Sequence, residues 1–216
     1  RDVFGNRMNT VFKFYYQAWV LLALASAYGL YYIVERARGL GRLLLLAGFV
    51  VLFVLGMVYP LVAGFDKAGG FAHPPTLDGL AWVRQYSPDE YAAVQWLNQH
   101  APDTQVILEA TGGSFTEYAR VSSRTGLPTL LGWGGHELQW RGNYDEPGRR
   151  EPDIDTIYSS LDTQQVLTLL EKYGITYVYV GPLERGKYGP AALAKFDRSM
   201  DVAFQRGNVT IYKRRP

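Results

Sequence analysis

The chain has 216 residues, of which 48% are hydrophobic, and its formal net charge is +2 at neutral pH. It contains no cysteine, which excludes a disulfide framework and thiolate chemistry. Residues 65–216 carry 16 Lys and Arg against 18 Asp and Glu, a balance that argues against a nucleic-acid-binding surface.

Two long uncharged stretches lie near the N-terminus. Residues 15–34 (YYQAWVLLALASAYGLYYIV) and 43–64 (LLLLAGFVVLFVLGMVYPLVAG) contain no Asp, Glu, Lys or Arg. A bilayer core of ~30 Å requires about 20 apolar residues in a helix, and both stretches reach that length. The sequence therefore predicts a pair of transmembrane helices. The alternative is two helices buried in a soluble core, but such helices normally keep a polar stripe.

The flanks of these stretches indicate a topology. Aromatic residues, which prefer the lipid–water interface, gather at both ends of the first stretch: Tyr15, Tyr16, Trp19, Tyr31 and Tyr32. The connection ERARGLGR (35–42) is short and basic, and such loops tend to stay cytoplasmic. We therefore expect an integral protein of the inner or plasma membrane. Residues 1–64 would form the N-terminal flank and the hairpin, and residues 65–216 an extracytoplasmic domain.

The outer region alternates helical and strand patterns. Residues 65–86 are rich in Gly, Pro and aromatic side chains and are interpreted as an irregular crossing from the membrane. The patterns that follow predict helices over 87–102, 114–126, 162–174 and 189–199, strands over 105–109 and 175–181, and a hairpin over 201–214 that turns at Gly207-Asn208. A long loop separates the second helix from the third. This order favours a compact α/β fold with a mixed sheet that has an antiparallel edge.

Two of these helices begin with a residue pattern typical of a capping box. Ser87 precedes Pro88 and is followed three residues later by Glu90, and Ser114 is followed in the same way by Glu117. The turn Gly112-Gly113-Ser114 would then precede a helix N-terminus, where backbone N–H groups can hold a phosphate. The alternative is an ordinary tight turn, because the complete phosphate-loop and dinucleotide fingerprints are absent.

Two short motifs raise the question of a metal ion. His136-Glu137 resembles the start of a zinc-protease helix, but HELQW lacks the second histidine at the i+4 position. Asp153-Ile154-Asp155 places two carboxylates in the predicted loop, where they could converge on a divalent cation. The alternative is that an acid of this pair merely caps a turn. The sequence gives no evident cofactor and no metal ligand set for this chain.

A third group combines aromatic, acidic and basic side chains within 33 residues. Tryptophan faces can stack on the C–H faces of sugars, carboxylates accept bonds from hydroxyls, and arginine suits phosphate. The alternative is a salt-bridged structural loop anchored by its tryptophans. The candidate substrate-binding residues are Glu109, Glu117, Tyr118, Arg120, Trp133, His136, Glu137, Trp140 and Arg141.

Four stretches together resemble a known family. They are RMNTVFKFYYQAW before the first apolar stretch, VILEATGGSFTEYARVSSRTGLPTLLGWGGHELQWRG, DIDTIYSS, and YGITYVYVGPLER. They resemble the YYY-type multi-span membrane proteins of Chloroflexi and archaea. The resemblance implies a fold like that of the GT-C membrane glycosyltransferases, with many spans and a C-terminal extracytoplasmic domain. The layout is also similar to the soluble end of oligosaccharyltransferase catalytic subunits.

The resemblance also implies which parts of such an enzyme are present. In GT-C transferases the catalytic acid and the divalent cation lie in loops between early spans, so this chain would be the last portion and would not be catalytic alone. Arg7, Asn9 and Lys13 match the family stretch before a span, where Arg7 and Lys13 could meet a lipid phosphate. The region from Glu109 to Arg141 would face the cavity above the membrane.

Three functions remain open from the sequence. The first is the C-terminal part of a GT-C-like glycosyltransferase that uses a polyprenyl-phosphate-linked sugar and whose outer domain shapes the substrate site. The second is a non-catalytic subunit held in a larger membrane complex by its two spans. The third is an extracytoplasmic glycan-binding module. The expected partners are membrane lipid, the lipid-linked sugar, and either other membrane-spanning subunits or a missing N-terminal portion, but not nucleic acid.

Overall fold

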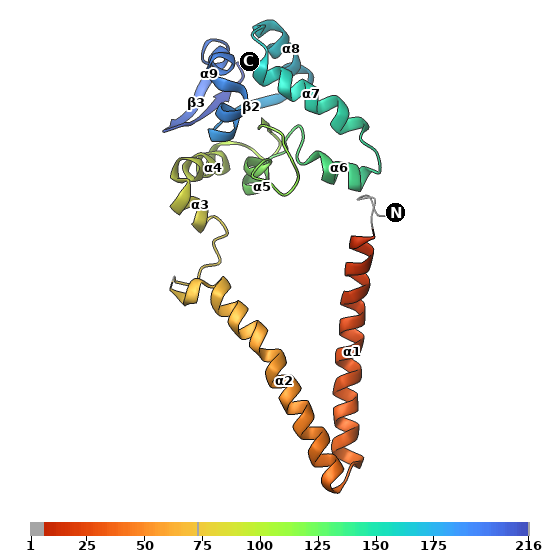
Figure 1. Ribbon diagram of the computed structural model, residues 1–216. Coiled ribbons are helices and arrows are strands. Elements are labelled where there is room, and N and C mark those ends of the chain that lie inside the picture. Colours follow the sequence, from red (N-terminus) through yellow and green to blue (C-terminus); the bar gives the residue numbers. More distant parts are fainter. Residues whose placement is uncertain (1–6, 73, 216) are drawn as a thin grey trace. The chain divides into compact units, whose positions relative to one another are not determined.

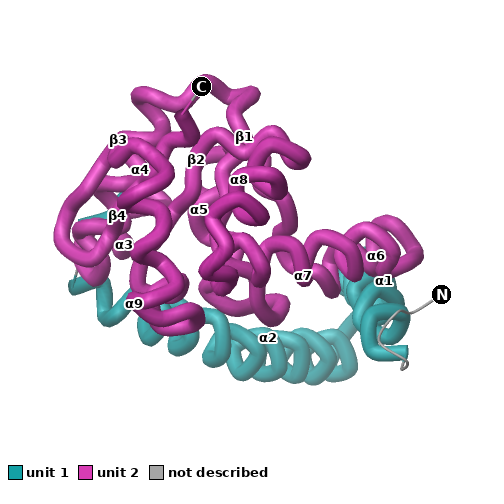
Figure 2. Tube along the Cα trace, turned by 90° about the horizontal axis from the view of Figure 1, so that it is seen from above, with its two compact units in different colours: residues 1–76 teal, residues 77–216 magenta. Residues whose placement is uncertain are grey.

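A computed structural model of the chain describes residues 7–72 and 74–215 (Figure 1). The chain separates into two compact units, Arg1–Thr76 and Leu77–Pro216 (Figure 2). The boundary expected from the sequence, between residues 64 and 65, lies within the second long helix of unit 1.

Unit 1 consists mainly of two long helices. α1 spans Met8–Arg36 and α2 spans Gly39–Lys67, so the eight-residue connection expected from the sequence shrinks to Ala37 and Arg38. Each helix has 29 residues and is therefore about 43 Å long, longer than the ~30 Å hydrocarbon core. Both are long and apolar enough to cross a membrane.

Neither long helix buries a residue within the described structure. A pair of helices inside a soluble core would be covered by other elements, so the alternative considered from the sequence is wrong for this fold. Exposed Leu, Val, Phe and Tyr side chains cover both helices, which suits contact with lipid tails or other apolar helices.

The segment between the long helices and the outer domain is less irregular than expected. α2 continues to Lys67, a short 3₁₀ turn (η1) occupies Gly69–Phe71, and α3 spans Ala81–Tyr86. The expectation of an irregular crossing over residues 65–86 is therefore wrong at both ends, because helical hydrogen bonding extends into it from either side.

Unit 2 contains a four-stranded mixed sheet. Its strands are β1 (Val106–Leu108), β2 (Ile175–Val180), β3 (Asp201–Arg206) and β4 (Val209–Lys213). The spatial order is β1-β2-β4-β3, with β1 parallel to β2 and the other pairs antiparallel. The predicted mixed sheet with an antiparallel edge is confirmed, as is the hairpin turn, where Gly207 has a φ of 51°.

Helices cover both faces of this sheet. α4 (Pro88–His100) and α5 (Arg120–Thr125) contribute to the cluster on one face, and α7 (Asp145–Ser159), α8 (Thr163–Lys172) and α9 (Pro182–Ser199) to the cluster on the other. α6 (Gly134–Arg141) packs on α7 instead. Alternate residues of β2 enter different hydrophobic clusters: Val178 packs with Ile154 and Phe196, whereas Tyr177 packs with Leu97. This two-sided burial explains why β2 reads as an almost continuous apolar run.

The prediction of a long loop between residues 127 and 161 is wrong, because α6 and α7 occupy most of this range. The sequence of α7 contains Gly148 and Pro152, which normally break helices. Tertiary packing overrides them, since Ile154, Ile157 and Tyr158 are fully buried at helical spacing. α6 buries no residue completely, so its sequence carried a weaker helical signal.

Both predicted capping boxes are also wrong. α4 begins after Ser87 as expected, but the Ser87 side chain makes no cap bond and Glu90 pairs with Arg120 instead. The second helix begins at Arg120 rather than after Ser114. The N-terminus of α5 is held from outside the helix, because the carboxylate of Glu109 accepts bonds from the N–H groups of residues 121 and 122.

Lys195 provides a test of the packing between α9 and α7. Its Nζ is buried and donates to the carbonyls of Tyr158 (2.6 Å) and Ser160 (2.8 Å) at the C-terminal end of α7. Burial lowers the pKa of Lys195 to about 8. Above that pH the unfolded chain, with its ordinary lysine pKa, binds more protons than the folded chain, so folding stability rises with pH.

We therefore expect the unfolding free energy of the wild type, relative to Lys195→Met, to rise by about 1–2 kcal/mol between pH 8 and pH 10. Pulse proteolysis in urea on the full chain in lipid nanodiscs measures both proteins. Parallel pH profiles for the two proteins would contradict the lowered pKa.

Candidate functional site

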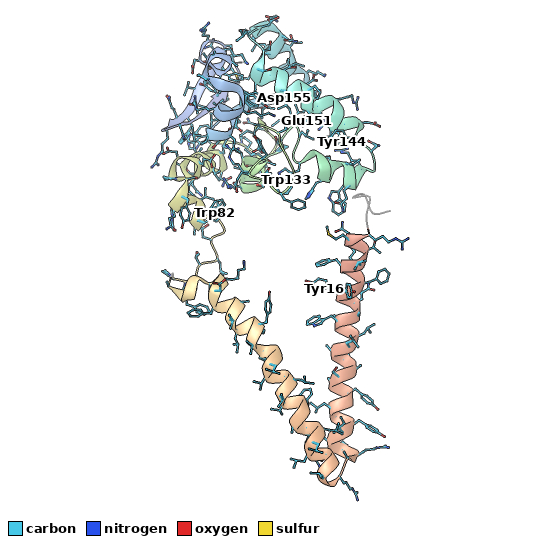
Figure 3. All side chains as sticks on the ribbon, in the orientation of Figure 1. Tyr16, Trp82, Trp133, Tyr144, Glu151 and Asp155 are labelled. Carbon is cyan, nitrogen blue, oxygen red and sulfur yellow. The ribbon has the colours of Figure 1, made fainter. Side chains whose placement is uncertain are left out.

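A surface cavity of about 590 Å³ lies in unit 2 between α5 and α6. Five of the nine substrate-binding residues expected from the sequence line it, and Trp133 is labelled in Figure 3. The lining residues are Ala119, Ser122, Ser123, Trp133, His136, Glu137, Trp140 and Arg141.

The helical form of residues 134–141 brings these side chains together. His136 and Trp140 are four residues apart, as are Glu137 and Arg141, so each pair stacks on neighbouring turns of α6. Trp133 occupies the position just before the helix and joins the same lining. The sequence pattern pointed to these residues but predicted a loop. In a loop the four-residue spacing would not bring the side chains together.

Three aromatic rings form a cluster at the edge of the cavity. The rings of Trp133 and His136 meet edge to face at 5.0 Å, and Phe115 lies 5.5 Å from Trp133 and 4.9 Å from His136. The indole N–H of Trp133 donates to the carbonyl of Tyr118 at 2.7 Å, which fixes the ring orientation. Sequence reasoning missed Phe115, although it lies in the same aromatic-rich stretch.

The backbone near this cluster is strained. Phe115 has a φ of 61° and Ala119 a φ of 63°, a left-handed conformation that residues other than glycine rarely adopt. Such a conformation costs on the order of 1 kcal/mol or more and tends to persist where function requires a particular geometry. Here the loop 112–119 holds the Phe115 ring outward, with 74% of the residue exposed.

Glu137 and Arg141 form the charged part of the lining. Arg141 Nε donates to Glu137 Oε2 at 2.5 Å, and this hydrogen bond raises the pKa of Arg141. Within the described residues, the bond occupies only one of the guanidinium nitrogens. The two terminal nitrogens therefore stay available for a phosphate or carboxylate, which arginine prefers to bind through two parallel bonds.

Three glycines in this region lie in close contact with neighbouring side chains. A Cβ at Gly112 would lie 2.0 Å from the Tyr118 ring, one at Gly134 2.7 Å from the Tyr144 hydroxyl, and one at Gly135 2.7 Å from Ser114 Oγ. The Tyr144 hydroxyl in turn donates to Glu151, and both residues are labelled in Figure 3.

The Gly112-Gly113-Ser114 turn does not lead directly into a helix. Residues 112–119 are irregular and α5 begins only at Arg120. The expectation that this turn precedes a helix N-terminus, on which phosphate binding depended, is therefore wrong. Gly112 instead makes room for the Tyr118 ring, and Gly135 of α6 lets that helix approach Ser114 closely.

Arg120 and Glu109, two of the predicted site residues, are buried beneath the cavity rather than lining it. Arg120 Nε donates to Glu90 at 2.8 Å and its Nη2 donates to Glu184 at 3.0 Å. Glu184 also accepts bonds from the backbone N–H groups of Ala110 and Gly181, which follow β1 and β2. The network thus ties α4, α5 and α9 to the carboxyl ends of the two parallel strands.

Glu109 follows β1 and is completely buried. Burial raises its pKa, although the bonds it accepts from Ser122 and Val121, each 2.8 Å long, act in the opposite direction. Its carboxylate anchors the N-terminus of α5, whose Ser122 and Ser123 line the cavity. Glu109 and Arg120 therefore position the cavity wall without reaching its surface.

The remaining predicted residues lie outside the cavity lining. Glu117 is exposed and pairs with Arg124 at 3.2 Å, while Tyr118 packs on Gly112 and accepts the Trp133 bond through its carbonyl. The candidate lipid-phosphate residues belong to unit 1. Arg7 and Lys13 are both exposed at the N-terminal end of α1.

The two carboxylates of the Asp153–Asp155 motif do not converge. The motif lies within α7, and positions two residues apart on a helix face different directions. Asp153 contacts Lys172 and Tyr173, whereas Asp155 contacts Lys187 and Tyr188. The expectation of a loop in which they meet is therefore wrong. Among residues 7–72 and 74–215 no cluster of three His, Cys, Asp or Glu side chains suits a metal ion.

The fold and the two apolar helices define a membrane-associated α/β protein. No family model matches the sequence, and no curated protein matches it. The resemblance to YYY-type membrane proteins therefore stays a prediction.

Among solved structures, the chain is similar to the C-terminal globular domain of an oligosaccharyltransferase from Archaeoglobus fulgidus. The two share 12% sequence identity with a TM-score of 0.38, and the match covers 58% of this chain and 95% of the other.

Proposed function

We propose that this chain is the C-terminal membrane hairpin and outer domain of a GT-C-like glycosyltransferase that uses a polyprenyl-phosphate-linked sugar. In this proposal the cavity between α5 and α6 binds the sugar phosphate. The observation that carries it is the meeting of two tryptophans, a histidine and an arginine–glutamate pair in one open cavity.

The cavity suits a saccharide in size and chemistry. Its volume of about 590 Å³ lies within the range of about 300–1,000 Å³ typical of small-molecule sites. Trp140 is 85% exposed and Trp133 lines the same cavity, so both can offer an apolar face to the C–H groups of a sugar ring. Glu137 can accept hydrogen bonds from the hydroxyl groups of the sugar, and Arg141 can pair with a phosphate.

Within this proposal the chain binds and orients substrate, and the acid–base chemistry belongs to loops between spans outside this sequence. The network of Glu109 and Arg120 keeps α5 in place, so the cavity wall is preformed. Arg7 and Lys13, at one end of α1, suit contact with the phosphate of a lipid carrier.

Binding to the full chain in lipid nanodiscs tests the proposal. We expect Trp140→Ala and Arg141→Ala each to weaken the binding of a polyprenyl-phosphate-linked hexose about tenfold, a loss of about 1.4 kcal/mol. The matched control is Arg215→Ala, which removes an exposed arginine that also pairs with a carboxylate, at 2.9 Å from Asp201. Affinities equal to that of the wild type for both cavity variants would sink the site assignment.

A second ligand distinguishes phosphate binding by Arg141 from sugar stacking by Trp140. With polyprenyl phosphate that carries no sugar, Arg141→Ala is expected to weaken binding and Trp140→Ala to leave it unchanged, because only the phosphate partner would remain. Equal losses for the sugar-bearing and the sugar-free ligand in Trp140→Ala would contradict stacking on the sugar.

A second candidate function is a non-catalytic subunit of a larger membrane complex. It is favoured by the uncovered surfaces of α1 and α2, where a Cβ at Gly29, Gly48 or Gly56 would meet no atom within 4 Å. Small residues at such positions permit close packing by other helices. Mild detergent extraction and native mass measurement distinguish the two candidates. A stoichiometric complex with unrelated subunits supports this one, and pairing with a homologous many-spanning portion supports the first.

A further inference from the structure

The exposed apolar side chains of unit 2 are unevenly distributed. In the described part of this unit, most of the large exposed ones belong to α3 and its approach, the loop 112–119, and the segment from α6 to the start of α7. They are Leu77, Trp82, Tyr86, Phe115, Trp140 and Tyr144, while Leu161 and Val202 lie elsewhere. Large exposed apolar patches mark interaction sites for proteins or membranes.

The elements that carry these residues occupy one side of unit 2. In Figure 1, α3, α5 and α6 run along one edge of the unit, and α8 and α9 lie at the opposite edge. Figure 2 views the unit at right angles and shows α3 and α6 far apart with α5 between them. The residues Trp82, Tyr86, Phe115 and Trp140 are called the aromatic face below.

The composition of the aromatic face suits the lipid headgroup region. Tryptophan and tyrosine have an apolar ring and a polar group, and they are enriched where membranes meet water. Three of its members are strongly exposed, with Tyr86 and Phe115 at 74% and Trp140 at 85%. Phe115 adopts a strained left-handed backbone conformation, which keeps its ring at the surface rather than in the core.

The aromatic face belongs to the same chain as two helices of membrane-spanning length. α2 ends at Lys67 and α3 begins at Ala81, so thirteen residues, 68–80, connect a helix of membrane-spanning length to the aromatic face. Fully extended, this link reaches at most about 45 Å. Tethering on this scale produces a high effective concentration, so modest insertion of aromatic rings suffices for stable contact.

The charges around the aromatic face distinguish between kinds of lipid. Arg84 and Arg141 are exposed there, but so are Asp78 and Glu117, and the half-buried Glu137 pairs with Arg141. Without an excess of positive charge, attraction to anionic lipid contributes little, and burial of the rings dominates. We propose that the aromatic face rests in the headgroup region of the membrane that carries α1 and α2, and that a zwitterionic bilayer is sufficient.

This inference does not depend on the saccharide proposal, because it uses side chains exposed on the surface rather than the chemistry of the cavity. Trp140 belongs both to the cavity lining and to the aromatic face, so a ligand in the cavity would be reached from the membrane surface.

The absence of cysteine from the sequence makes a site-specific test possible. Single cysteines at Tyr86, Phe115 and Trp140 are labelled with a nitroxide in the full chain, reconstituted in phosphatidylcholine vesicles. The matched controls are cysteines at Leu161 and Val202, which are also exposed and apolar but lie outside the face. Spin relaxation by oxygen and by a water-soluble nickel chelate then reports whether each label is immersed.

The ratio of oxygen to nickel accessibility is expected to be at least threefold higher at the three face positions than at the two controls. Addition of anionic phosphatidylglycerol should leave the ratio unchanged. Equally aqueous labels at all five positions would overturn the proposal and leave the face to a protein partner. Immersion that appears only with anionic lipid would overturn the claim that a zwitterionic bilayer is sufficient.

Discussion

Arg120→Ala is expected to lower the free energy of unfolding of unit 2 by about 3–5 kcal/mol. The reason is that the substitution leaves the completely buried carboxylate of Glu184 without its cation, and Glu90 keeps only its pair with Arg124 at 3.6 Å. Burial lowers the pKa of Arg120, but Glu184 and Glu90 raise it by more, so the arginine is firmly charged. Removing it therefore exposes the full desolvation penalty of its partners.

Pulse proteolysis in urea on the full chain in nanodiscs measures this loss, with Arg206→Ala as the control. Arg206 also pairs with a carboxylate, 3.3 Å from Asp89, but the pair is exposed and is expected to contribute less than about 1 kcal/mol. If both substitutions cost the same small amount, the network around Arg120 does not hold unit 2 together.

Gly112→Ala is expected to disturb the cavity and to destabilise unit 2 by about 1–3 kcal/mol, the usual range for overpacking. The new Cβ would lie 2.0 Å from the Tyr118 ring, which must move. Because the carbonyl of Tyr118 accepts the Trp133 indole bond, the ring orientation of Trp133 would change with it. Binding of the lipid-linked hexose should weaken together with stability.

Gly113→Ala is a closely matched control for this effect. It adds the same methyl group one residue later, where the only neighbour within 4 Å among the described residues is Thr116 Cγ2 at 3.7 Å, an ordinary contact. Unfolding free energy and hexose affinity are measured for both variants. Similar losses in the two would mean that alanine disturbs the loop in general and not through Tyr118.

Seven of the nine predicted substrate-binding residues fall into two structural groups. Trp133, His136, Glu137, Trp140 and Arg141 line the cavity, whereas Glu109 and Arg120 hold the elements beneath it. Both groups belong to the segment that follows the carboxyl end of β1, and β1 lies beside the parallel strand β2. In open α/β sheets ligand sites commonly lie at this end, because the loops that leave adjacent parallel strands meet there.

The sequence alone determined the features that depend on local pattern. The two long apolar helices follow from uninterrupted hydrophobic runs, β2 from its buried β-rich segment, and α8 from Asp162, which caps it by accepting bonds from the N–H groups of Gln164 and Gln165. The hairpin follows from Gly207, whose positive φ a turn of this kind needs. In each case the residues that form the sequence pattern lie within the predicted element or a few residues from it.

Only the tertiary structure decided the features that depend on distant contacts. α7 forms despite Pro152 because its buried face packs on α8 and α9, and α5 starts at Arg120 because Glu109 satisfies its first N–H groups. The buried roles of Glu109 and Arg120 could not be read from their surroundings in the sequence, since a charged side chain is normally exposed. Arg120 is internal because Glu90 and Glu184, 30 and 64 residues away, converge on it, and only the completed fold brings those charges together.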